Sequence, residues 1–122
     1  MTKQLNDERA KHAYDFVYEI SKKDEKKQKE FRSLVRSFPA MVQNNGLCTA
    51  VAFLQSKGKF HHMKLYEAIE KWLKINNDDN EGLMESIVSL DRDKYRMVSK
   101  EIMSYLPWVK RFSEGMLSGD ES

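Results

Sequence analysis

Apolar residues recur at intervals of three and four along most of the chain, which is the spacing of one face of an α-helix. No segment sustains the strict alternation of apolar and polar residues that a half-buried strand requires. Only two prolines and five glycines interrupt the pattern. The sequence therefore predicts an all-α fold, a compact single-domain bundle of about five to six helices.

The N-terminal part divides into a helix, a loop and a second helix. Residues 2–20 carry an apolar face opposite a charged one and are predicted to form the first helix. Residues 21–30 are rich in Lys, Asp and Glu, and we expect a loop there because they offer no apolar anchor. The next helix buries Phe31 and Phe38 and then meets Pro39. Proline inside a helix costs about 3 kcal/mol, so we expect a kink or a fresh start at this residue.

Three further elements are predicted before the last helix. A helix over residues 40–55 contains Gly46, which indicates close packing or a bend. The chain then stops at Gly58 and enters a helix whose apolar face is formed by Leu65, Tyr66, Ile69, Trp72 and Leu73. A polar loop over residues 76–80 precedes a short helix over residues 83–90.

The last helix has the clearest pattern in the sequence. Asp91 can cap its N-terminus, and its apolar residues keep an alternating three-and-four spacing throughout. Pro107 lies inside this stretch and removes the hydrogen bond to the Met103 carbonyl. We therefore expect the helix to bend or to divide near this point. The tail, residues 118–122, is predicted to fray.

Composition limits the class of protein. A chain of 122 residues is the size of one domain, and its formal charge of +2 falls short of that of a free-standing nucleic-acid binder, so any basic surface must be local. The single cysteine, Cys48, cannot form an internal disulfide. Neither a signal-peptide core nor a membrane-length apolar run is present. We expect a cytoplasmic protein with no membrane partner.

The residue types that carry catalysis form no recognisable set. His61 and His62 are adjacent, so on a helix they point about 100° apart and cannot share a metal as an i, i+4 pair does. Cys48 has no local motif that supplies a base and an orienting group. Residues 77–81 lack the ordered ligands of a calcium loop. We expect a protein that is not an enzyme, with no metal, no cofactor and no small-molecule substrate.

The last helix carries a basic face opposite its apolar stripe. The cations of this face are Arg92, Arg96, Lys100, Lys110 and Arg111. Charge on a helix is usually only a solvated face, and Asp93 and Glu114 share the sector, so phosphate binding and simple solvation both stay open. Met97, Met103 and Trp108 also lie outside the stripe, either buried by a neighbouring helix or exposed to a partner.

Three stretches together resemble the small subunit of the type III-B CRISPR effector, the Cmr complex. The first is Phe38-Pro39, Asn45-Gly46-Leu47 and Ala52-Phe53-Leu54-Gln55-Ser56-Lys57. The second is the tryptophan-bearing helix around residues 66–73. The third is Tyr95, Glu101, Leu106 and Trp108-Val109-Lys110-Arg111-Phe112. They span most of residues 31–117, whereas the first thirty residues carry little of the resemblance. Pro107 departs from the pattern and leaves the direction of Lys110 and Arg111 open.

The resemblance implies an α-helical subunit without an active site, stacked in several copies as a minor filament beside the backbone subunits. Its partners would be the backbone and large subunits, further copies of itself, guide RNA and target RNA, while cleavage belongs to the backbone subunits. The basic positions that match the family are Lys57, Lys110 and Arg111. Arg92 and its neighbours on the last helix join them by helical geometry alone. Such cations would contact phosphates without reading bases.

Two other function classes stay open. A helical adaptor would bind only protein, through Met97, Met103 and Trp108, and its binding would lack a steep salt dependence. A nuclease would have to assemble its site from scattered carboxylates. Examples of such carboxylates are Asp91, Asp93 and Glu101.

Overall fold

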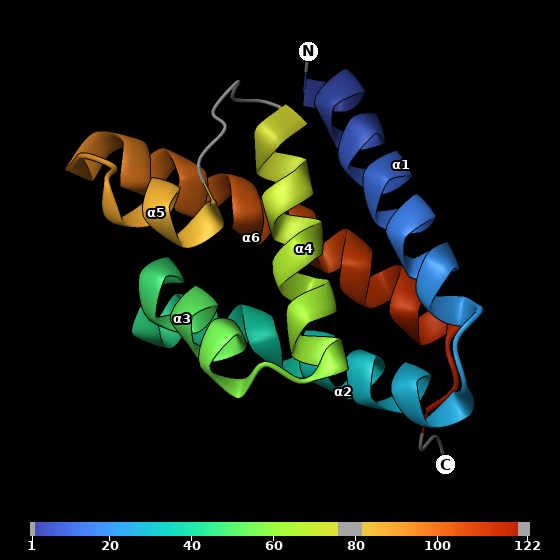
Figure 1. The fold of residues 1–122 in the computed structure, drawn as a ribbon. Coiled ribbons are helices and arrows are strands. Elements are labelled where there is room, and N and C mark those ends of the chain that lie inside the picture. Colours follow the sequence, from blue (N-terminus) through green and yellow to red (C-terminus); the bar gives the residue numbers. More distant parts are fainter. Residues whose placement is uncertain (1, 76–81, 120–122) are drawn as a thin grey trace.

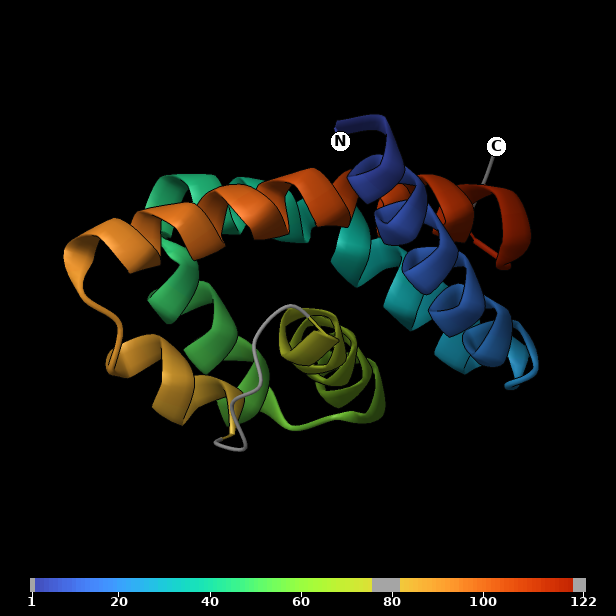
Figure 2. The same cartoon turned by 90° about the horizontal axis from the view of Figure 1, so that it is seen from above.

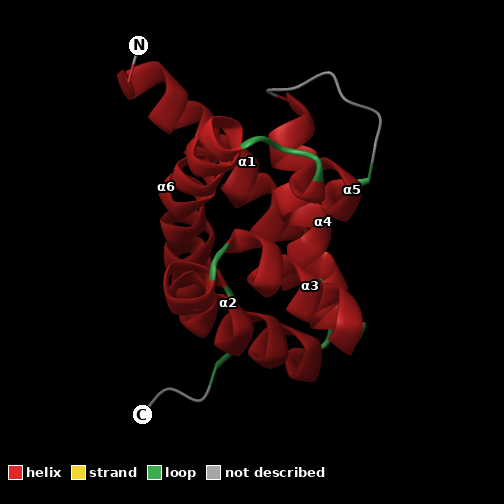
Figure 3. Cartoon of the chain, turned by 90° about the vertical axis from the view of Figure 1, so that its left-hand side faces the viewer, coloured by secondary structure: helices red, strands yellow, loops and turns green. Residues whose placement is uncertain are grey.

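The computed structural model describes residues 2–75 and 82–119. Regular structure within these residues is entirely helical (Figure 3). The helices are α1 (Thr2–Ser21), α2 (Glu25–Asn45), α3 (Leu47–Lys57), α4 (Phe60–Ile75), α5 (Leu83–Val88) and α6 (Arg92–Met116). The predicted all-α bundle is confirmed. Of the helices described, none is long and apolar enough to span a membrane.

The two longest helices, α2 and α6, pack against each other and run in opposite directions (Figure 1). The Arg32 side chain donates to the Glu114 carbonyl at one end of the pair, and the Cys48 amide donates to the Tyr95 hydroxyl near the other. α4 is seen almost end-on in Figure 2, with α3 and α5 to one side of it and α1 to the other. The core that these helices enclose is centred on fully buried Trp72 and Tyr105.

The segment predicted to be a loop, residues 21–30, is mostly helical. α2 begins at Glu25 because the Asp24 carboxylate accepts a hydrogen bond from the Lys27 amide and caps the helix. The turn before it is short and is held by the Gln28 side chain, which donates to the carbonyl of Lys23. The prediction was wrong because an entirely polar first turn can start a helix when a cap is present and burial begins only at Phe31.

Neither proline divides its helix. α2 continues through Pro39 and α6 through Pro107, so the predicted fresh start and division are wrong, whereas the alternatives, a kink at Pro39 and a bend at Pro107, stay predictions. A single missing donor is tolerated here because long runs of packed residues lie on either side of each proline. The break falls instead at Gly46, with φ +91°, which separates α2 from α3 and replaces the single helix predicted over residues 40–55. Gly46 marks the bend that the sequence indicated.

Other boundaries agree with the sequence. Gly58 ends α3 in the left-handed conformation, with its amide bonded to the Leu54 carbonyl, and the Asp91 side chain caps α6. The predicted loop at 76–80 and residues 120–122 of the predicted tail lie outside the described residues. Ser118 does not fray: its amide donates to the Gln28 side chain, beside buried Leu117.

Candidate nucleic-acid interface

The basic face predicted for the last helix is exposed along α6. Arg92, Arg96 and Lys100 follow one another at intervals of four residues, and all three are solvent-exposed. Arg111 is also exposed, and Lys110 is half-buried. At 1.5 Å per residue, Arg92 and Arg111 lie about 28 Å apart along the axis. The structure thus presents these five cations on one side of a single long helix.

The direction of Lys110 and Arg111, left open by Pro107 in the sequence, follows from the continuity of α6. Because the helix passes through Pro107 without dividing, both cations keep the helical register of Arg92. Together with Pro107 and Glu114 they line a shallow hollow of about 230 Å³. The Glu114 carboxylate shares this hollow and lowers the positive potential there.

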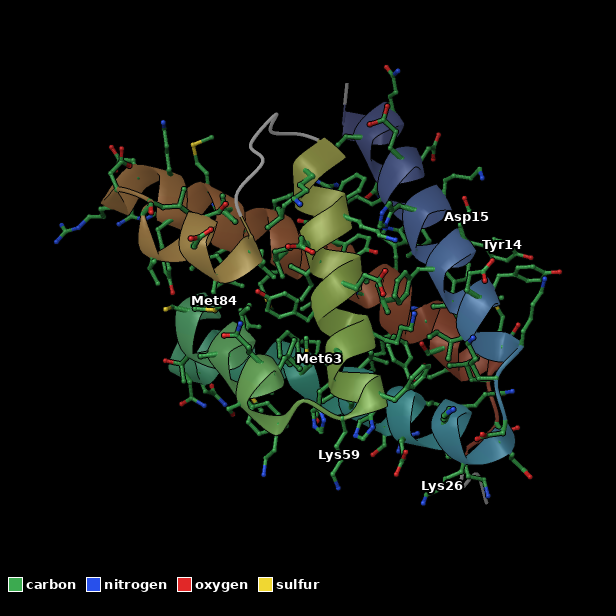
Figure 4. All side chains as sticks on the ribbon, in the orientation of Figure 1. Tyr14, Asp15, Lys26, Lys59, Met63 and Met84 are labelled. Carbon is green, nitrogen blue, oxygen red and sulfur yellow. The ribbon has the colours of Figure 1, made fainter. Side chains whose placement is uncertain are left out.

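Lys57 lies apart from the other predicted phosphate contacts. It is the last residue of α3, whereas Cys48, which bonds to Tyr95 on α6, lies near the first. Lys57 is exposed, and its ammonium lies 5.7 Å from the centre of the Phe53 ring. Lys59 on the α3–α4 connection also points away from the bundle (Figure 4). The structure therefore separates Lys57 from the other predicted phosphate contacts, which lie on the α6 face.

Arg36 on α2 is an exposed cation that lies outside the predicted set of phosphate contacts. Arg32 on α2 reaches the Glu114 carbonyl on α6, and the two helices run in opposite directions. One turn further along α2, exposed Arg36 is therefore level with Lys110. Only the pairing of α2 with α6 brings these residues to one level, and no local sequence signal could have shown it.

The predicted protein-contact residues differ in exposure. Met97 is 68% exposed, whereas Met103 and Trp108 pack against the core. The Trp108 ring stacks on Phe112 at a centroid distance of 5.9 Å, and its indole N–H donates to the Asn6 side chain. Of the two predicted alternatives, packing against the core therefore applies to Met103 and Trp108, and exposure applies to Met97, whose contact with a partner stays a prediction.

Two of the three carboxylates named for a nuclease have structural partners. Asp91 caps α6, and Glu101 accepts two hydrogen bonds from Arg9 and one from the Trp72 indole, each at 2.8 or 2.9 Å. The pKa of Glu101 is held below its usual range by the Arg9 hydrogen bonds, against an opposing effect of burial. No three His, Cys, Asp or Glu side chains converge on a metal-sized site among the residues that the structure describes.

Comparison with known proteins gives the family. Residues 5–116 match the model for the CRISPR-associated protein family Cas_Cmr5. The chain belongs to the Cas_Cmr5 family. It is 28% identical to the Cmr5 subunit of the CRISPR system Cmr from Thermus thermophilus, over 88% of this chain and 91% of that protein. It is 29% identical to the corresponding Cmr5 subunit from Thermotoga maritima, over 98% and 90% of the two chains.

A solved structure supports the same assignment. The crystal structure of a CRISPR-associated Cmr5 family protein from Thermus thermophilus aligns with a TM-score of 0.77 and 27% identity, covering 90% of this chain and 94% of that one. The predicted resemblance to the small subunit of the type III-B Cmr complex is confirmed. The chain is a subunit of the Cmr CRISPR complex, and its partners include other Cmr subunits.

The three stretches that carried the resemblance to Cmr5 meet in the fold. Tyr95 from the closing helix accepts a hydrogen bond from the Cys48 amide in the central segment, at 2.8 Å. Glu101 from the closing helix accepts one from Trp72 on the tryptophan-bearing helix. Polar side chains of α6 thus fix its position against both other stretches, and these bonds hold the basic face of this Cmr5 chain in place.

The histidines of this Cmr5 chain are packed into the fold. His12 Nδ1 lies 2.7 Å from the Tyr105 hydroxyl, and the His61 and His62 rings contact each other at a centroid distance of 4.1 Å. Burial lowers the pKa of all three imidazoles, and for His62 the neighbouring His61, Lys57 and Lys59 lower it further. Glu30, 3.6 Å from His61, acts in the opposite direction.

Acidification is therefore expected to destabilise the fold between about pH 7 and pH 5. The unfolded chain takes up protons near the ordinary histidine pKa of about 6.5, whereas the folded chain does so only at lower pH, so stability falls as pH falls through this range. Thermal unfolding at a series of pH values measures the effect. Double substitution of His61→Asn and His62→Gln should reduce the dependence of stability on pH. If the melting temperature of that variant fell with pH as steeply as that of the unchanged chain, the histidines would not be the cause.

Glu67 and Glu101 do not contribute in this range, because their lowered pKa values place their titration below it.

Proposed function

We propose that this Cmr subunit is non-catalytic and acts in the cytoplasm, where several copies stack beside the backbone subunits and help hold guide RNA paired with target RNA. The observation that carries this proposal is the basic face of the unbroken helix α6, with Lys110 and Arg111 in register with Arg92, Arg96 and Lys100.

The proposed mechanism is contact with phosphates. Arg and Lys side chains on a rigid helix meet the backbone of a nucleic acid without reading its bases, as a guide-directed complex requires, because base pairing already supplies sequence specificity. Three or four contacts per copy give a log-log salt slope of roughly −2 to −3 for single-stranded RNA. One copy would bind weakly, and stacking would raise affinity by adding contacts.

Reconstitution of the effector with a charge-reversed subunit tests this proposal. We expect substitution of Arg96, Lys100, Lys110 and Arg111 by Glu to lower target-RNA affinity by at least about tenfold and to flatten its salt dependence. The matched control reverses four exposed lysines elsewhere, giving the same net charge, at Lys11, Lys26, Lys71 and Lys74. This control should bind target RNA nearly as tightly as the unchanged subunit.

The same experiment separates the rival function. If both variants co-assemble and bind target RNA equally well, the α6 cations are a solvated face and the subunit is a protein-only adaptor. The observation that favours the adaptor is the exposure of Met97, so substitution of Met97 by Asp should then block assembly. If the α6 variant alone loses affinity, phosphate contact is supported.

A further inference from the structure

Four aromatic rings form a row across the junction of α6 and α1, away from the centre of the basic face. Trp108 stacks on Phe112 at 5.9 Å, Phe112 meets Tyr14 edge-on at 5.5 Å, and Tyr14 lies nearly parallel to Tyr18 at 6.3 Å. Tyr14 and Tyr18 are 44% and 45% exposed. Figure 4 shows Tyr14 at the outer edge of α1, with its side chain directed away from the bundle. We name these four residues the aromatic row.

The fold has little need of the tyrosines in this row. The inner face of α1 is completed by Ala13, Val17 and Ile20, each fully buried. Tyr14 and Tyr18 each follow one of these core residues and so turn toward solvent, where nearly half of each ring stays in contact with water. Large rings held in line on a surface, rather than scattered singly, indicate a binding function.

Cations stand at both ends of the aromatic row. The Lys22 ammonium lies 4.7 Å from the centre of the Tyr18 ring. Arg111 directly precedes Phe112 and is exposed, and on α6 the sector of Arg111 and Lys100 adjoins that of Trp108. Asp7, next to Asn6 in the chain, is an exposed acid at the Trp108 end.

One carboxylate beside the row is paired with a cation. Asp15, beside Tyr14 in the chain, is bound by the Lys11 ammonium at 2.7 Å in an exposed ion pair. Positive charge at the ends and apolar ring surface between them complement a polyanion that has flat apolar groups. This charge pattern distinguishes the aromatic row from an ordinary protein-contact patch.

We propose that the aromatic row stacks unpaired bases of a single-stranded RNA segment whose phosphates are held by Arg111 and Lys22. The inference rests on the proposed RNA contact of α6 and extends it to RNA outside the guide–target duplex. Bases in a duplex already stack on one another and present only their edges. The exposed rings can therefore stack only on unpaired bases. The rings contact one another at centroid distances of 5.5 to 6.3 Å, so bases would stack on the exposed ring surface of Tyr14 and Tyr18 rather than between rings.

The test uses the full-length chain and oligoadenylate of about ten nucleotides, within the range that single-strand sites cover. Double substitution of Tyr14→Leu and Tyr18→Leu removes two rings and keeps apolar side chains at an exposed surface. Affinity for oligoadenylate should fall about tenfold for each base that loses its ring, because stacking carries that part of the binding. The salt slope should not change, since no cation is removed. The matched control, Tyr14→Phe and Tyr18→Phe, should bind within about twofold of the unchanged chain because it retains both rings.

The outcomes separate this inference from the proposed function. Reversal of Arg96, Lys100, Lys110 and Arg111 changes the salt slope and the affinity of the effector for target RNA. The leucine variant leaves unchanged the binding of a target RNA that is paired with the guide along its whole length. The inference is overturned if the leucine variant binds oligoadenylate as tightly as the unchanged chain, or if the unchanged chain does not bind it. It is also overturned if the leucine variant binds RNA normally and fails to co-assemble with other Cmr subunits, which would make the row a protein interface.

Discussion

Replacement of Glu101 by Ala is expected to lower the free energy of unfolding by about 3 kcal/mol, among the largest effects available from one polar residue. Glu101 accepts both hydrogen bonds of a bidentate Arg9 contact and a third from Trp72. The Arg9 and Glu101 side chains are only 11% and 21% exposed. Without the carboxylate, a largely buried guanidinium and a fully buried indole N–H lose their acceptor.

Thermal and chemical unfolding measure this effect, which corresponds to a melting temperature lower by about 10 °C for a domain of this size. The control is Glu67→Ala on α4, which removes ion pairs to Lys64 and Lys71 near the surface and should cost less than about 1 kcal/mol. Equal losses in the two variants would show that the Arg9–Glu101–Trp72 contact contributes no more than a surface pair.

The Glu101 contact also predicts a pH dependence below that of the histidines. Its pKa is lowered in the folded chain, so its stabilisation is present above the unfolded value of about 4.5 and is lost as pH falls through the lowered pKa. Arg9 stays protonated throughout, since its pKa is raised from an already high value.

Replacement of Gly46 by Ala is expected to cost about 2 to 3 kcal/mol. The backbone at Gly46 has φ +91° and ψ 156°, a conformation that residues with a Cβ atom adopt only under strain. An added Cβ would also lie 3.4 Å from the Tyr95 hydroxyl, the group that accepts the Cys48 hydrogen bond. Alanine would therefore strain the backbone of the α2–α3 bend and crowd the Tyr95 hydroxyl, which connects this bend to α6 through the Cys48 hydrogen bond.

Gly115→Ala is the matched control, because the same methyl group is added inside α6 with no atom within 4 Å. Alanine there should stabilise the helix by about 0.5 to 1 kcal/mol, the usual gain over glycine in a helix interior. Chemical unfolding compares the two directly. A loss at Gly46 no larger than about 0.5 kcal/mol would mean that the bend relaxes to accept a side chain.

Apolar spacing alone established the class of fold, because a helix must bury one face and that face repeats with the helical period. It located α4 and α6 well, and the caps at Asp91 and Gly58 followed from local chemistry. Order and spacing of three motifs also indicated the family. Each of these features depends on residues close together in the chain.

Local rules failed where tertiary packing outweighed them. The sequence could not show that α2 and α6 would run unbroken through Pro39 and Pro107, because the burial on either side that offsets a missing donor depends on the other helices. The start of α2 at Glu25 was also missed. Its first turn is polar and buries no side chain, so the apolar pattern gave no signal there, and only the Asp24 cap marks the start of the helix.

The functional surface, too, was predicted from the sequence only where it depends on one helix. The α6 cations could be read from the sequence because they share one helix, whereas their separation from Lys57 and their alignment with Arg36 depend on how α3 and α2 pack. The aromatic row joins Tyr14 to Phe112, nearly a hundred positions away, and the Glu101 contact joins three helices. Sequence periodicity assigns a residue to a face of its own helix, but only the packed structure decides which faces meet.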